Sequence, residues 1–561
     1  MTERKEAPGN VLKKLDETRM AEAVRDLRDA GCEALVIHFL HAYANPAHEI
    51  RAAEIAAELW PNDYITMGHS LLSETREFER GVTAAVNASV QPLLERYVAR
   101  LREELAGKGY RGDVLVMNGN GGMVSSRLVA REAAKTVMSG PASGVMAAAY
   151  TGRRAGELNL LTYDMGGTST DVALIRDGTP PISNEIEIEY AMPIHVPMVD
   201  VRTVGAGGGS IAVVDAAGLL QVGPASAGAD PGPICYGKGG TEPTISDANM
   251  LLGRLNPDKL NAVAGGVSND QIAQIFKDKL GTPLGVDATQ GAEAVIRIAN
   301  AKMAGAIRMV SLSLGADPRD FALFAIGGAG HLKEEELARE HGVPRVIDTA
   351  RPGLTYALGC VVADLRLDYV QTINQLLGAD AVARVETVFA DQLSAGKAAL
   401  ARESVTMNDI HKTFSVDMQF LGQSHVVRVP LGTATPTEHE LRSGFETVYW
   451  NLFKVALPEI QARIVNVNTS VVGVRNPVDL SRLIDPENQG QSVVPTGHRQ
   501  VVFDGTAHQT PIYWRDHLPP DAALSGPAII EQLDTTVLLP PGDQVTSGAD
   551  GNLIIHIGGA A

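Results

Sequence analysis

The stretch LTYDMGGTSTDVALI, at residues 161–175, decides how this chain folds. One apolar run precedes its two glycines and another follows its hydroxyl residues, which predicts two strands joined by a tight turn. The Walker loop and the dinucleotide fingerprint, two better known glycine signatures, place a helix directly after the glycines. Because a strand follows here, the segment predicts a β-hairpin and excludes both signatures.

The residue types in this turn suit a phosphate group and a metal ion. Gly166 and Gly167 permit positive φ and a close approach, so that successive N–H groups form a concave anion site. Asp164 ends the first strand, where its carboxylate suits a hydrated Mg²⁺. Hydroxyl donors come from the next three residues, Thr168, Ser169 and Thr170. The alternative is a plain Gly-Gly hairpin turn without a ligand. In that case the aspartate, the two glycines and the three hydroxyl residues would occur together by coincidence.

A second glycine-rich segment, VGAGGGS, occupies residues 204–210. Its main-chain donors could cradle phosphate or an activated substrate. The candidate residues are Gly207, Gly208, Gly209 and, through its hydroxyl, Ser210. A flexible hinge is the alternative, because such glycine patterns are weak without flanking context.

Composition excludes several classes of partner. The 561 residues carry a formal net charge of -18, so most of the surface repels a phosphate backbone and nucleic acid is not expected. The three cysteines, Cys32, Cys235 and Cys360, are far apart and suggest neither a disulfide framework nor a zinc ribbon. No apolar run has the length of a membrane span. A cytoplasmic, unexported protein without a membrane partner is predicted.

Apolar periodicity predicts an α/β alternation up to residue 370 and a β-rich region after it. The clearest predicted elements are strands at 34–40 and 321–326 and helices at 47–59, 83–105 and 381–401. These elements predict three domains, at residues 1–145, 146–370 and 371–561.

Several polar residues invite a metal or catalytic role. On a strand, His38 and His41 would point to opposite faces, so packing and capping roles are favoured over a shared metal for these residues and for His48. Cys235 has no activating histidine nearby in the sequence, which favours packing. Further polar residues that could line a cleft are His195, Asp200, Asp230 and Asp247.

The hairpin segment resembles the signature of the hydantoinase A/5-oxoprolinase family. The resemblance extends over nearly the whole chain, since further segments match in the family's order. The matching segments are FLHAYANPAHE (39–49), SGPA (139–142), DMGGTSTDV (164–172), TVGAGGGSI (203–211), GPASAGADPGP (223–233), CYG (235–237), SDAN (246–249) and GPAIIE (526–531).

The resemblance implies a sugar-kinase/actin/Hsp70-like, RNase H-like ATPase core of two lobes. Residues 1–145 would be an incomplete first lobe, 146–370 the second lobe, and 371–561 a β-rich C-terminal domain. In that architecture glycines after a buried strand pack under adenosine, and the segment FALFAIGGAG at 321–330 supplies Gly327, Gly328 and Gly330. A turn that uses glycine for geometry alone is the alternative. His331 stands where the family usually has proline.

The activity implied is ATP-dependent opening of a lactam or cyclic imide, such as hydantoin or 5-oxoproline, by phosphorylation of the amide oxygen. Asp164 would hold Mg²⁺, residues 166–171 would hold phosphate, and Asp171 would orient a water or a hydroxyl. A separate B-type subunit is the expected partner.

Two alternatives remain. One is the ATPase subunit of an acetone- or acetophenone-type carboxylase. The other is an inactive remnant that binds nucleotide or a partner, because the family's usual chain opens with another Asp-x-Gly-Gly-Thr hairpin, and this sequence has only the one at residues 164–168. The resemblance therefore also implies a partner chain that supplies this first phosphate loop, or a truncated reading frame.

Overall fold

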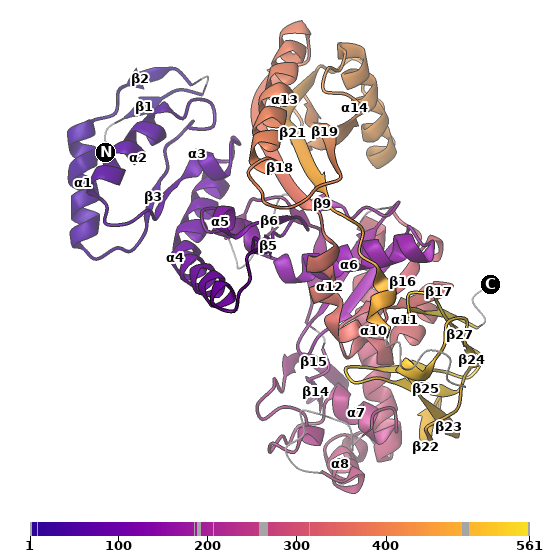
Figure 1. The fold of residues 1–561 in the computed structure, drawn as a ribbon. Coiled ribbons are helices and arrows are strands. Elements are labelled where there is room, and N and C mark those ends of the chain that lie inside the picture. Colours follow the sequence, from indigo (N-terminus) through magenta and orange to yellow (C-terminus); the bar gives the residue numbers. More distant parts are fainter. Residues whose placement is uncertain are drawn as a thin grey trace. The chain divides into compact units, whose positions relative to one another are not determined.

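The computed structural model describes residues 3–7, 9–183, 186–187, 192–205, 207–256, 267–313, 315–484 and 493–558. The chain forms two units, each described by itself (Figure 1). The first comprises Met1–Ala142, Ile182–Val199 and Ala363–Asn476, and the second comprises Ser143–Pro181, Asp200–Val362 and Pro477–Ala561. Residues 371–476 therefore belong to the first unit and residues 477–561 to the second, while the three domains proposed from the sequence stay a prediction.

The second unit is built on a large mixed sheet. In spatial order its strands are β13 (Val201–Val204), β8 (Thr170–Ile175), β7 (Leu160–Met165), β16 (Ala322–Ile326), β17 (Arg345–Asp348), β28 (Leu553–His556), β27 (Gln544–Ser547) and β24 (Ala523–Ser525). The central strands β7, β16 and β17 are parallel, and β8 is antiparallel to β7. Every residue of β7 and β16 is buried, as in strands that are covered on both faces. The predicted hairpin at 161–175 and strand at 321–326 are confirmed.

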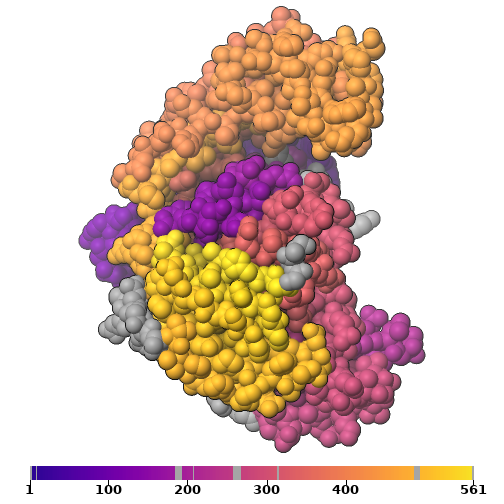
Figure 2. All heavy atoms as spheres, turned by 90° about the vertical axis from the view of Figure 1, so that its right-hand side faces the viewer, coloured from indigo at the N-terminus to yellow at the C-terminus, as the bar shows by residue number. Residues whose placement is uncertain are grey.

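Helices and a smaller sheet complete this unit. The helices are α6 (Ser139–Ala155), which leads into it, α7 (Ile245–Leu251), α8 (Asn269–Phe276), α9 (Thr282–Leu284), α10 (Ala288–Ser313), α11 (Glu334–His341) and α12 (Thr355–Val362). The other strands are the β14 (Ser210–Val214) and β15 (Leu220–Ser226) pair and the sheet of β22 (Gly497–Phe503), β23 (Thr506–Trp514), β25 (Ala528–Glu531) and β26 (Thr536–Leu539). Figure 2 shows the C-terminal strands, in yellow, forming a broad part of its surface.

The first unit contains a sheet that two helices cover on one face. Its strands are β20 (Val427–Leu431), β19 (Asp409–Phe420), β21 (Ala462–Val474), β18 (Leu365–Leu376), β6 (Met123–Ser125) and β5 (Leu115–Met117). Apolar residues of β19, β20 and β21 pack against α13 (Ala379–Leu400) and α14 (Glu438–Phe453), which Figure 1 shows beside these strands. The predicted helix at 381–401 is thus confirmed within a residue or two.

The N-terminal part of this unit is α/β. It contains β3 (Leu35–Ile37), β4 (Ile65–Met67), α1 (Glu17–Asp29), α2 (Ala47–Leu59), α3 (Gly68–Leu71), α4 (Glu77–Gly107) and α5 (Ser126–Val129). The predicted helix at 47–59 is confirmed, the one at 83–105 lies inside the longer α4, and the strand predicted at 34–40 shortens to three residues. Short strands are β1 (Arg4–Lys5), β2 (Val11–Lys13), β9 (Ile182–Ser183), β10 (Ile186–Glu187), β11 (Pro193–Ile194) and β12 (Met198–Val199). Across the described residues, every helix is too short or too polar to cross a membrane.

Candidate functional site

The tip of the β7–β8 hairpin presents unpaired main-chain donors. The Gly166 amide donates to the Ser169 carbonyl at 2.9 Å, which closes the turn. Among the described residues, the amides of Gly167, Thr168 and Ser169 have no hydrogen-bond partner. A Cβ on Gly167 would meet nothing within 4 Å, so the space over the turn is open. Three successive unpaired amides at an exposed turn can hold an anion such as phosphate, with Gly207 packed closely against the Thr168 nitrogen.

The two glycines act differently from the expectation. Neither Gly166 nor Gly167 has a positive φ. Their contribution is the absence of side chains at an exposed turn, which leaves the amides accessible. Thr168 and Ser169 lie at this tip, whereas Thr170 is buried at the start of β8.

Two carboxylates face each other at the base of the turn. Asp164 of β7 lies opposite Asp171 of β8 in the strand register. Burial, and next the negative charge of Asp171, raise the pKa of Asp164 to about 7. The Thr203 hydroxyl donates to Asp171 at 2.6 Å. This surplus of negative charge beside the phosphate-type donors fits a divalent cation, for which Asp164 and Asp171 are the available ligands.

The second glycine-rich segment supports the hairpin. The Gly208 and Gly209 amides donate to the carbonyls of Gly166 and Gly167 at 3.0 and 2.8 Å, and the Gly207 amide donates to the Ser210 hydroxyl at 2.9 Å. The expectation that this segment offers its main-chain donors and the Ser210 hydroxyl to phosphate is therefore not met in this conformation, because those donors and that hydroxyl are engaged. A Cβ on Gly207 would lie 2.5 Å from the Thr168 nitrogen, so only glycine permits this contact.

The third glycine segment follows β16 and lies beside Asp164. Ile326, the last residue of β16, pairs with Asp164 in the register, so the chain turns at Gly327 next to that carboxylate. Gly327 has a φ of +81°, and a Cβ there would lie 2.6 Å from the Asp164 Oδ1. A Cβ on Gly330 would lie 3.2 Å from the Tyr163 ring. The glycines are therefore required by close packing against β7.

One cavity of about 350 Å³ joins the three segments. Gly166 and Gly167, Gly208 and Gly209, and Gly328 all line it. Gly207, Ser210, Gly327 and Gly330 support the walls without lining it. Its volume is in the range of small-molecule sites. Cys235 also lines it, but burial, first of all, raises the pKa of its thiol, and its amide is held by Asp247 at 2.7 Å, which suits packing rather than nucleophilic chemistry.

Lys333 is a cavity residue that the sequence reasoning missed. It is 1% exposed, and its Nζ has no hydrogen-bond partner among the described residues. Burial lowers the pKa of Lys333 to about 7. A buried amine without a partner, on a residue that lines this cavity, is available to pair with an anion. The only sequence signal was its place immediately after the third glycine segment. Asp534 was missed as well, and its carboxylate accepts the Gly353 amide at 2.8 Å.

His331 belongs to a buried ionic cluster behind this cavity. Its Nδ1 lies 3.1 Å from Glu334 and 3.3 Å from Asp348, and Arg515 donates to Asp348 at 2.7 Å. Burial opposes protonation, but the two carboxylates raise the pKa of His331 to about 9. The three residues have metal-ligand spacing. Because Arg515 and a protonated His331 already supply positive charge, the cluster is compensated without an ion.

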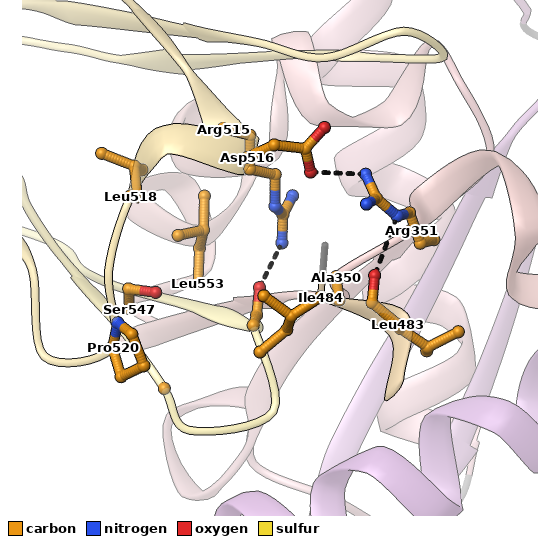
Figure 3. A pocket seen from close by; sticks show the side chains of 12 residues that line it. Ala350, Arg351, Leu483, Ile484, Arg515, Asp516, Leu518, Pro520, Ser547 and Leu553 are labelled. Carbon is orange, nitrogen blue, oxygen red and sulfur yellow. Dashed lines mark hydrogen bonds and ion pairs between the residues drawn. The ribbon is translucent and has the colours of Figure 1, made fainter. Parts of the chain in front are cut away.

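Arg515 also borders a small cavity of about 20 Å³, shown in Figure 3. There Arg351 donates to Asp516 at 2.6 Å and to the Leu483 carbonyl at 3.2 Å. The volume suits a single water, so this cavity is structural.

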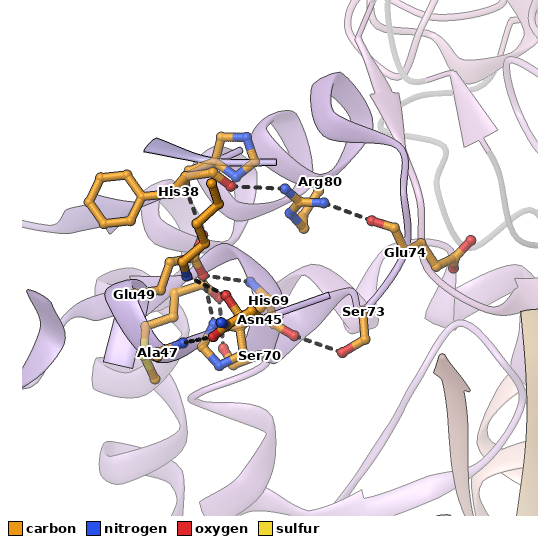
Figure 4. Close-up of polar contacts among 12 residues, drawn as sticks. His38, Asn45, Ala47, Glu49, His69, Ser70, Ser73, Glu74 and Arg80 are labelled. Atoms are coloured by element: carbon orange, nitrogen blue, oxygen red, sulfur yellow. Dashed lines mark hydrogen bonds and ion pairs between the residues drawn. The ribbon is translucent and has the colours of Figure 1, made fainter. Parts of the chain in front are cut away.

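In the first unit, the segment 39–49 holds its own loop together (Figure 4). The buried Glu49 carboxylate accepts the amides of Phe39 and His69 at 2.8 and 2.9 Å, and Arg80 donates to the Phe39 and Glu74 carbonyls at 3.0 and 2.7 Å. These contacts give residues 39–49 a structural role in holding the loop.

The predicted orientation of the histidines is wrong. His38 and His41 do not point to opposite faces, because β3 ends at Ile37 and His41 turns the chain with a φ of 57°. Their rings approach the same Glu77 carboxylate at 3.9 and 3.8 Å. His195 pairs with Glu74 at 3.1 Å in the first unit, whereas Asp200, Asp230 and Asp247 belong to the second, so these four do not form one cluster within a unit.

The fold and the site define a mixed α/β protein with a glycine-lined cavity beside a hairpin tip of unpaired amides. The chain belongs to the hydantoinase/oxoprolinase family. Family models match the N-terminal region at residues 1–60, the hydantoinase/oxoprolinase region at 80–369 and the C-terminal domain at 376–558.

Named relatives and a solved structure agree with this membership. The chain is 32% identical to the caprolactamase subunit alpha of Pseudomonas jessenii, over 96% of this chain and 78% of the relative. It is 30% identical to the acetophenone carboxylase gamma subunit of Aromatoleum aromaticum, over 99% and 78%. The crystal structure of the ATP-dependent caprolactamase from Pseudomonas jessenii matches with a TM-score of 0.87 and 30% identity, over 99% of this chain and 81% of that one.

Proposed function

We propose that this chain is the ATP-using subunit of an enzyme that opens a lactam or cyclic imide. The observation that carries the proposal is the hairpin tip, where three unpaired amides lie above the facing carboxylates of Asp164 and Asp171. The likeness to a caprolactamase subunit supports a cyclic amide as substrate. The parallel strands β7, β16 and β17 with the β7–β8 hairpin support an actin-like ATPase core.

In this proposal each group of residues has one task. The amides of Gly167, Thr168 and Ser169 bind the terminal phosphates of ATP, and Lys333 adds positive charge. Asp164 holds Mg²⁺, which neutralises charge on the phosphates when bound. The adenosine lies along Gly328 and Ala329, where the missing side chain of glycine leaves room. Asp171 orients a water or hydroxyl.

The chemistry makes an unreactive amide hydrolysable. The amide oxygen attacks the γ-phosphorus and the bond to ADP breaks, which gives an imidate phosphate. Water then attacks the carbon, and the ring C–N bond breaks to leave an acyl phosphate and an amine. A second water attacks the acyl carbon and the C–O bond to phosphate breaks, so that phosphate leaves with the former amide oxygen. A B-type subunit completes the hydrolytic half, and the proposal includes a chain that carries an Asp-x-Gly-Gly-Thr hairpin among the candidate partners.

Isotope transfer tests the proposal. The chain is combined with a B-type subunit, Mg²⁺-ATP and a lactam or hydantoin labelled with ¹⁸O at the carbonyl. We expect one ¹⁸O atom in the released phosphate per ring opened, because the amide oxygen becomes a phosphate oxygen. Ring opening with unlabelled phosphate would refute this route, because C–O cleavage of the acyl phosphate leaves the former amide oxygen on phosphorus.

A carboxylase is the second candidate, because of the likeness to an acetophenone carboxylase subunit. The same ATPase module would then activate a ketone. Incubation with ketone, bicarbonate and Mg²⁺-ATP separates the two, since only the carboxylase fixes labelled bicarbonate into an acid.

A further inference from the structure

The sheet of the first unit has a polar face opposite the one that α13 and α14 cover. On β21 the side chains of Asn466, Asn468 and Ser470 share this face, since alternate residues of a strand point the same way. Thr469, between them, donates instead to Gln392 of α13 at 2.6 Å. The strand register places Val370 and Ser415 on either side of Asn468.

The polar rows on both sides of Asn468 are hydrogen-bonded. On one side Thr372 donates to Asn466 at 2.6 Å, and Asn466 donates to Asp417 at 3.1 Å. On the other side Asp368 accepts Asn120 at 2.7 Å and pairs with Arg366 at 3.0 Å. The polar side chains of both rows therefore have hydrogen-bond partners within the protein.

Asn468 itself is the exception. It is 8% exposed, yet neither its Nδ2 nor its Oδ1 has a hydrogen-bond partner among the residues that the structure describes. Leaving a buried carboxamide unpaired is unfavourable, because the group has lost its water without gaining a partner. This residue lines a cavity of about 280 Å³, so a ligand in that cavity can supply the missing partners.

The cavity favours a small neutral ligand. Its volume lies near the lower end, roughly 300 Å³, of small-molecule pockets. Its two guanidinium groups are already paired, Arg366 with Asp368 and Arg428 with Asp417 at 2.9 Å. A charged ligand would therefore have to compete with an existing ion pair.

The unpaired carboxamide of Asn468 also favours a ligand with a particular hydrogen-bonding pattern. Asn468 offers one acceptor and one donor side by side in a plane. A cis amide has its N–H and C=O on the same side and can form both hydrogen bonds at once. An acyclic secondary amide is trans and cannot, because the cis form costs about 2.5–4 kcal/mol. Small lactams, cyclic imides and cyclic ureas are held cis by their rings.

We propose that this cavity binds the cis-amide edge of a small, neutral cyclic amide through Asn468. The inference rests on the proposed function for the identity of this class as substrate. The binding step itself requires neither ATP nor the phosphate hairpin. Thr413 and Ser415, which pair with Ser470 and Asn468 in the register, line the same cavity and would contact the ring.

Binding of unlabelled lactams to the full chain without ATP tests the proposal, by saturation-transfer NMR and calorimetry. We expect 2-piperidone and hydantoin to bind. N-methyl-2-piperidone, which lacks the N–H, and N-methylacetamide, which is trans, should bind at least tenfold more weakly. Asn468→Leu should lower affinity for 2-piperidone at least tenfold, whereas Asn408→Leu, at an exposed asparagine of the same unit outside the cavity, should not change it.

Two controls keep the outcomes separate. Asn468→Leu should retain the wild-type affinity for Mg²⁺-ATP, which shows that the variant is folded. Asp164→Asn should retain lactam binding while it loses Mg²⁺-ATP. Equal binding of 2-piperidone and its N-methyl derivative, full binding by Asn468→Leu, or no lactam binding by the wild type would overturn the inference. Failure of the ¹⁸O experiment with lactam binding intact would instead refute the proposed function.

Discussion

Asp164 and Asp171 are directly opposite each other on antiparallel strands, so the phosphate-type turn between them closes over two like charges. Opposed carboxylates destabilise a strand pair, and the raised pKa of Asp164 reflects burial first and this repulsion second. A turn with a purely structural role does not require two carboxylates on opposite strands. The repulsion is relieved when a cation binds between the carboxylates.

We predict a pH-dependent stability that Mg²⁺-ATP removes. The folded pKa of Asp164, about 7, lies above its ordinary value of 3.8, so the folded state binds a proton that the unfolded state has lost. The resulting stability is present below about pH 4 and is lost as pH rises to about 7, with a slope of up to about 1.4 kcal/mol per pH unit. Urea unfolding from pH 4 to 8 measures it. Asp164→Asn should flatten the profile; an unchanged profile would contradict the assignment.

Mg²⁺-ATP affinity should show the opposite trend. Because the metal competes with the proton on Asp164, affinity should increase between about pH 6 and 8 and then level off. Asp171→Asn removes the neighbouring charge, so the midpoint should move to lower pH. Calorimetry at several pH values tests both statements, and a midpoint that Asp171→Asn leaves in place would exclude the proposed coupling.

Gly207→Ala should disrupt the hairpin. The new Cβ would lie 2.5 Å from the Thr168 nitrogen and 2.6 Å from the Gly167 carbonyl carbon, which are backbone atoms that cannot rotate away. Overpacking of about 1–3 kcal/mol predicts a loss of about 5- to 150-fold in Mg²⁺-ATP affinity. Gly205→Ala is the matched control, since its Cβ would meet only Pro224 at 3.8 Å. Equal affinities for the two variants would show that the segment does not support the hairpin.

Local sequence predicted the hairpin, the helix α2 and the strand β16, because each is specified by residues close together in the chain. The cavity was only partly accessible to such reasoning. Lys333 and Asp534 enter it through the packing of strands that are distant in sequence, and no short motif marks them. The assignment of residues 371–476 and 477–561 to different units likewise depends on a nonlocal contact, the pairing of β28 with β17. Asn468 is conspicuous only through its missing partners.

The two arginines near the small cavity of Figure 3 should differ strongly in their contribution to stability. Arg515 and Asp348 are 4% and 0% exposed, whereas Arg351 and Asp516 are 23% and 21% exposed. Arg515→Met would leave Asp348 charged and buried, which costs about 3–5 kcal/mol, and Arg351→Met should cost about 1 kcal/mol or less. Thermal unfolding of both variants measures the contrast. Equal melting temperatures for the two variants would mean that His331 alone compensates the negative charge of Asp348.

Lys333→Met should stabilise the free protein and weaken nucleotide binding. Burial holds the folded pKa of Lys333 at about 7, below its ordinary value of 10.5, so stability present above about pH 10.5 is lost as pH falls to about 7. Methionine removes this loss, and the melting temperature at pH 7 should rise. A hydrogen bond from a charged group to phosphate is worth about 1.5–3 kcal/mol, so Mg²⁺-ATP affinity should fall about 10- to 150-fold. Lys302→Met, which removes an amine bonded to the Val222 carbonyl outside the cavity, is the control and should leave affinity unchanged. If Lys333→Met were less stable than the wild type and bound Mg²⁺-ATP normally, the amine would have a role in folding. An amine that serves a ligand instead destabilises the protein when no ligand is bound.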